Sequence, residues 1–123
     1  MFINYNNNPA DAKQYDTTRL RSEFLTENLF INEDVTMVYS HIDRVVSIGV
    51  CPSDKPLKLD DFVDKKTFGT EFFLQRRELG IINLGGKAEV RCQEKSYVLE
   101  HLDALYLGKG EQDIAFVSLE KDQ

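Results

Sequence analysis

The stretch FLQRRELGIINLGG, residues 73–86, decides the fold class of this 123-residue chain. Residues 79–84 are mostly apolar and predict a short strand, and Gly85 and Gly86 directly after it predict a tight turn. Residues 87–92 then form the returning arm of a predicted hairpin, and residues 68–75 predict a further strand in front of it. The centre of the chain therefore has the pattern of a β-sheet.

Short apolar runs of the same kind continue on both sides of this stretch. Residues 36–50 form the longest run, with apolar residues on both alternating faces, and predict one internal strand. The polar residues 51–66 predict a loop with one short strand, and three more strands are expected at 97–99, 104–107 and 114–119. Strands interrupted every 8 to 12 residues or so are typical of an antiparallel sandwich or a small barrel.

The first 28 residues differ from the rest. They begin with a polar, Asn-rich stretch that predicts an arm. Asp16 or Thr17 can cap a short helix over residues 18–25, in which Leu20 and Phe24 lie four positions apart on one face. We therefore predict two parts, an N-terminal arm with a short helix at 1–28 and a β domain at 29–123, in a mainly all-β fold.

Composition excludes several classes of function. The net charge of −6 and the pI of about 4.9 disfavour nucleic-acid and membrane partners, because those surfaces are bound by surplus Lys and Arg. The chain has no apolar run near the ~20 residues of a membrane helix and no leader-like start, so we expect a cytoplasmic protein. We also expect Cys51 and Cys92 to be free thiols, although the sequence alone leaves a disulfide open.

The first of two motifs that mark the cupins, a family of small β-barrels, is partly present. Its second half is Glu, six residues and Gly, and Glu78 and Gly85 reproduce that spacing. The positions that hold histidines in the motif are Phe72 and Leu74 here, or Glu71 and Phe73 under the other spacing. The chain therefore resembles a cupin without its ligands, and we expect a cupin-like antiparallel β-barrel or jelly roll.

The second cupin motif is altered in the same way. Gly108-Lys109-Gly110 takes the place of Pro-x-Gly, whereas Asp113 replaces the histidine, Val117 the asparagine and Leu102 the leading glycine. Zn, Fe or Mn in such a barrel is held mainly by imidazole, and Phe and Leu donate no lone pair. We expect no metal ligand in this chain and an interior packed with Phe72, Phe73 and Leu74.

Two clusters are candidates for a site. Arg76 and Arg77 can clamp the carboxylate of an acidic substrate, but an ion pair with Glu78 at a strand end explains them at least as well. His41 can act as a general base oriented by Asp43, which shares its strand face if 36–50 is one strand, although a structural histidine is the commoner case. We predict substrate contacts at Arg76 and Arg77 and no catalytic residue.

Three longer segments, residues 36–44, 73–86 and 103–110, closely resemble the amino-terminal half of the 5-keto-4-deoxyuronate isomerases, the 4-deoxy-L-threo-5-hexosulose-uronate ketol-isomerases of pectin breakdown. Residues 16–25 match as well, and the resemblance runs from about Asp16 to Leu119. It implies an aldose–ketose isomerase, an intramolecular oxidoreductase, built from two cupin halves and assembled into hexamers. The resemblance also implies a zinc ion that is held by three histidines and a glutamate of the carboxy-terminal half.

Two classes of function follow. In the first, this chain is the non-catalytic barrel of the isomerase, which packs against the zinc-bearing half or self-associates and is inactive alone. In the second, it is a free-standing cupin-like module that binds a uronate-like acid through Arg76, Arg77 or Lys109.

Overall fold

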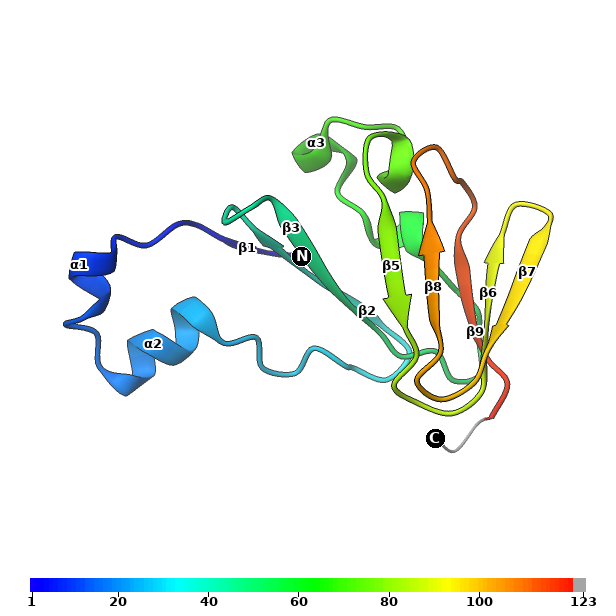
Figure 1. The fold of residues 1–123 in the computed structure, drawn as a ribbon, viewed down its shortest axis with the longest axis horizontal. Coiled ribbons are helices and arrows are strands. Elements are labelled where there is room, and N and C mark those ends of the chain that lie inside the picture. The colour runs from blue at the N-terminus through cyan, green and yellow to red at the C-terminus, as the bar shows by residue number, and fades with distance from the viewer. Residues whose placement is uncertain (121–123) are drawn as a thin grey trace.

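The computed structural model describes residues 1–120, and its elements are mostly strands. Figure 1 shows a β body and an N-terminal arm that stands off to one side of it. The strands are β1 (Phe2–Asn4), β2 (Val35–Ser40), β3 (Val45–Val50), β4 (Leu57–Lys58), β5 (Leu79–Ile82), β6 (Ala88–Cys92), β7 (Lys95–Leu99), β8 (Ala104–Leu107) and β9 (Ala115–Ser118). The helices are α1 (Pro9–Ala12), α2 (Thr17–Phe24) and α3 (Lys65–Phe68), with 3₁₀ turns η1 (Leu59–Phe62) and η2 (Phe73–Gln75).

The strands form three sheets in the orders β1-β2-β3, β4-β9-β6-β7 and β5-β8. Every pairing except the parallel one between β1 and β2 is antiparallel, which confirms the mainly-β, antiparallel prediction. Within residues 1–120 the three sheets do not join into a closed barrel. The architecture is therefore that of a cupin-like β fold that stays open.

The prediction of one strand over residues 36–50 is wrong, because this run is the β2–β3 hairpin. The chain reverses over residues 41–44, where Asp43 and Arg44 both have left-handed backbones, with φ of 56° and 54°. The turn brings Val35 opposite Val50 and Ser40 opposite Val45. The even alternation of apolar residues hid this reversal, since neither Gly nor Pro marks it.

The predicted hairpin of residues 79–84 with 87–92 is also wrong. β5 pairs with β8, whereas β6 pairs with β7 and β9, so the Gly85-Gly86 turn carries the chain from one sheet to another. The cause lies just before the turn, where the Asn83 N–H donates to the carbonyl of Asp103 at 2.9 Å and continues the β5–β8 ladder. The Gly-Gly pair indicates a turn, but it does not indicate which distant strand β5 pairs with.

Residues 68–75 do not form the predicted strand. Asp64 caps α3 by accepting from the N–H groups of Lys66 and Thr67, and Gly69, at φ 61°, ends it in the left-handed region. The side chain of Asp60 then accepts from the Phe73 N–H at 2.8 Å and starts the η2 turn. The short strand predicted within 51–66 is confirmed as β4.

The predicted helix near residue 18 is confirmed as α2. Asp16 is its N-cap, and its carboxylate accepts from the Arg19 N–H at 2.8 Å. Leu20 and Phe24 remain 40% and 54% exposed, so nothing in the described part of the chain covers the apolar face of this helix. β1 lies inside the predicted 1–28 arm but pairs with β2, a strand of the predicted β domain. The division of the chain into an arm and a β domain stays a prediction.

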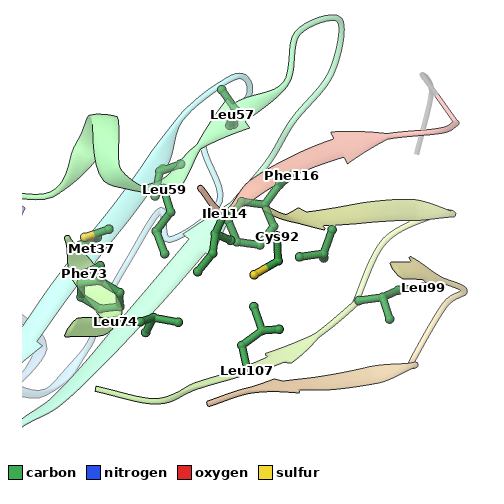
Figure 2. Close-up of a cluster of buried hydrophobic side chains, with 12 residues drawn as sticks. Met37, Leu57, Leu59, Phe73, Leu74, Cys92, Leu99, Leu107, Ile114 and Phe116 are labelled. Carbon is green, nitrogen blue, oxygen red and sulfur yellow. The ribbon is translucent and has the colours of Figure 1, made fainter. Parts of the chain in front are cut away.

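One apolar core holds the body together (Figure 2). Leu59, Leu74 and Val90, from different parts of the chain, are at most 2% exposed, and Phe73 lies beside them at 3%. Burying a side chain of this size contributes about 1.5–3 kcal/mol. Phe73 and Leu74 therefore pack the interior, as the sequence predicted, whereas Phe72 is only half-buried. None of the described helices is long and apolar enough to cross a membrane.

Candidate functional site

Two of the positions that bind metal in cupins serve as packing here. Phe73 and Leu74 lie in the core, as Figure 2 shows, and Asp113 is an exposed loop residue with a left-handed φ of 56°. Across residues 1–120 no three His, Cys, Asp or Glu side chains gather where they could hold a metal ion. The residues that occupy these positions therefore do not fit a zinc ion.

Arg77 is engaged by the protein itself. The Cζ of its guanidinium lies 5.3 Å from the Tyr39 ring centroid and 5.0 Å from that of Phe68, and Nη1 donates to the Arg44 carbonyl at 3.1 Å. This arrangement stabilises the β2–β3 turn through cation–π and hydrogen-bond contacts. The role of Arg77 in binding an acid stays a prediction.

Glu78 takes a partner that the sequence did not suggest. Its carboxylate accepts a hydrogen bond from the Tyr106 hydroxyl, which favours the neutral phenol and raises the pKa of Tyr106. Glu78 belongs to none of the ion pairs found among residues 1–120, so the predicted pair with Arg76 or Arg77 is not formed. Arg76 is exposed.

His41 does not share a strand face with Asp43, because both lie in the turn between β2 and β3. Its ring stacks on Tyr5 with centroids 4.7 Å apart and 12° between the planes, and it also meets the Tyr39 ring at 4.9 Å. The His41 N–H donates to the Asn4 carbonyl at 2.9 Å. His41 therefore attaches β1 to the body, and the general-base hypothesis that rested on a shared strand face is wrong.

Asn83, which the sequence reading passed over, organises one end of the body. Its Nδ2 donates to the carbonyls of Gly86, Leu99 and Glu100 at 2.7, 3.0 and 3.1 Å, and its Oδ1 accepts from the Gly85 N–H at 3.1 Å. His101, which is exposed, places Nδ1 3.0 Å from the Gly85 carbonyl. An Asn two residues before a Gly-Gly pair was the available signal, since its side chain can bond the backbone of the turn.

The two cysteines are free thiols, as predicted. Cys92 is 2% exposed and donates to Oε2 of Glu111 at 3.1 Å. Burial and the neighbouring carboxylate raise the pKa of Cys92 to about 11, because both penalise a thiolate. This thiol stays protonated and unreactive at neutral pH, so it is not a nucleophile.

The described body has an apolar cavity of about 570 Å³. Its walls come from β3, from β5 and the turn that follows it, and from the ends of β6, β7 and β9. Leu29 and Phe30, from the strap between α2 and β2, also line it. This cavity is partly open to solvent, so it is a recess in the surface of the body rather than a sealed void in the core.

Comparison with known proteins gives a consistent result. No family model matches the chain. It is 44% identical over 114 residues to the 4-deoxy-L-threo-5-hexosulose-uronate ketol-isomerase of Enterobacter sp. (strain 638), a match that covers 93% of this chain and 41% of that protein. The same enzymes of Yersinia enterocolitica and Escherichia coli (strain K12 / DH10B) are 44% identical over 112 and 111 residues, in each case 40% of their length. The chain is therefore a homologue of the 4-deoxy-L-threo-5-hexosulose-uronate ketol-isomerases and spans about two-fifths of the length of these relatives.

Proposed function

We propose that this chain is the amino-terminal, non-metal-binding cupin-like domain of such a ketol-isomerase, acting in uronate and pectin catabolism. The observation that carries this proposal is 44% identity over about nine-tenths of the chain. The reaction would interconvert 5-dehydro-4-deoxy-D-glucuronate and 3-deoxy-D-glycero-2,5-hexodiulosonate, an aldose–ketose change that moves a proton between neighbouring carbons.

The domain's contribution to that activity would be structural. Two of the positions at which a cupin holds its metal are filled by the core side chains of Phe73 and Leu74, and no described cluster could hold a metal ion, so we place the zinc in the carboxy-terminal half. The chain would pack against that half or against copies of itself and so build the oligomer, in the cytoplasm. Exposed apolar side chains on α2 and on the strap that follows it, such as Phe24 and Phe30 at 54% and 55%, support association of one of these kinds.

The test is an isomerase assay of the purified chain, with and without added zinc, beside the same chain fused to the carboxy-terminal three-fifths of the Enterobacter relative. We expect turnover of the keto-uronate by the fusion only. Turnover by the 123-residue chain alone would contradict a non-catalytic role.

The second candidate is a free-standing module that binds a uronate-like acid. One observation favours it: the Gly110 N–H donates to the Leu74 carbonyl at 2.7 Å, which brings the turn that carries Lys109 beside the segment that carries Arg76. Both cations are exposed. Calorimetric titration with galacturonate decides this point, because an Arg76→Ala variant should lose any heat the chain shows. The absence of heat above dilution argues against the module.

A further inference from the structure

One strand in the wall of the cavity is unusually open. β5 belongs to a sheet of two strands, so within residues 1–120 only β8 pairs with it. The cavity touches four consecutive β5 residues, Leu79, Gly80, Ile81 and Ile82, and no residue of β8 among those described. Since alternate residues of a strand point to opposite faces, a cavity that touches all four lies along the edge of β5 rather than against one face.

The backbone of β5 shows which groups face that edge. Asn83 donates to Asp103, and Ile81 and Leu79 lie opposite Leu105 and Leu107 in the same register. In an antiparallel ladder every second residue bonds to the partner strand, so the N–H and C=O groups of Gly80 and Ile82 point away from β8, along the cavity. These are the groups with which a further strand would pair.

The edge also lacks the features that protect sheet edges from pairing. Residues 79–82, Leu-Gly-Ile-Ile, contain no charge and no proline, and no atom lies within 4 Å of a Cβ placed on Gly80. Across the cavity β3 presents the apolar side chains of Val46, Ile48 and Val50. An occupant of this slot must be extended, to use the free backbone groups, and apolar on its inner face, to fill the cavity.

From this geometry we infer that the slot between β5 and β3 accepts an extended apolar strand supplied by the carboxy-terminal half. The inference rests on the proposed function and adds the surface and the mode of contact, strand addition. Two observations favour this occupant. About three-fifths of each relative's length lies outside its match to this chain. Ser118, at the end of β9, lines the cavity, so any chain that continues past β9 starts beside the slot.

The test is amide hydrogen exchange of Gly80 and Ile82, measured residue by residue in the 123-residue chain and in its fusion to the carboxy-terminal three-fifths of the Enterobacter relative. In the separate chain these two amides should exchange fast, whereas Ile81 and Asn83, which face β8, should be protected and serve as internal references. In the fusion, exchange at Gly80 and Ile82 should slow by about ten-fold or more.

A pair of variants of the fusion tests the backbone contact itself. Gly80→Pro removes an N–H that does not face β8, so it should leave the β5–β8 ladder intact while it abolishes the gained protection at Ile82. Gly80→Ala keeps the N–H and should show the protection.

The outcomes separate the two proposals. An active fusion whose Gly80 and Ile82 amides exchange as fast as in the separate chain overturns the strand inference and leaves the proposed function standing. An inactive fusion contradicts the proposed function and, with it, the inference. Protection that appears in the separate chain and grows with its concentration would assign the slot to a second copy and overturn the occupant named here.

Discussion

Replacing Gly49 with alanine should destabilise the protein through a clash with the strap that follows α2. A Cβ at this position of β3 would lie 2.0 Å from the Leu29 carbonyl oxygen and 2.7 Å from its Cγ, whereas ordinary contacts begin near 3.4 Å. The backbone of Leu29 would have to withdraw by more than an ångström. Gly49 does not have a left-handed φ, so the requirement for glycine here comes from the close approach of the strap.

The strap has little freedom to move away. Just beyond Leu29, the Asp34 N–H donates to the Ile31 carbonyl at 3.1 Å and the Glu33 N–H to the Cys51 carbonyl at 2.7 Å. Overpacking of a fixed structure costs roughly 1–3 kcal/mol. An unfolding entropy of about 2.1 cal/mol/K per residue makes each kcal/mol worth about 4 °C in a chain of this size, so Tm should fall by roughly 4–12 °C.

The assay is thermal and urea unfolding of Gly49→Ala and wild type, with Gly80→Ala as the matched control. Gly80 is also a strand glycine, but a Cβ there meets nothing within 4 Å. The control should be as stable as wild type or slightly more so, because alanine restricts the unfolded chain. A Gly49→Ala protein with the Tm of the control would refute the reasoning.

Three further predictions concern side chains. Asn83→Ala should cost about 1–3 kcal/mol, since it removes the amide group that bonds the backbone carbonyls of Gly86, Leu99 and Glu100. Urea unfolding measures the loss, and an unchanged midpoint would contradict the bracing role given to Asn83. The Cys92 thiol, whose pKa is raised to about 11, should stabilise the fold fully below pH 9 and lose that contribution as the pH rises towards 11, because the unfolded thiol ionises first. Unfolding midpoints of wild type and Cys92→Ala against pH measure this, and parallel curves between pH 8 and 11 would speak against it. At pH 8 an alkylating reagent should modify Cys51 well before Cys92.

The local predictions that succeeded depended on groups close together in the chain. The helix beginning after Asp16 needs only the carboxylate of that residue and the nearby N–H of Arg19. The strands at residues 97–99, 104–107 and 114–119 follow from short apolar runs between polar turns, and the structure places β7, β8 and β9 there. The resemblance to the ketol-isomerases was likewise readable from contiguous segments, and 44% identity supports it.

Pairing and site geometry depended on groups far apart in the chain. The sequence determined the mainly-β class, the capped helix, the apolar residues at the metal positions and the kinship with the isomerases. Only the tertiary structure decided that β5 pairs with β8 instead of β6, that residues 36–50 fold back at Asp43 and Arg44, and that Arg77 lies against Tyr39 and Phe68. The physical reason is that the alternation of apolar residues determines which face of a strand is buried, but not which other strand its backbone pairs with. The pairing depends on contacts such as the hydrogen bond between Asn83 and Asp103, which forms only when the chain folds.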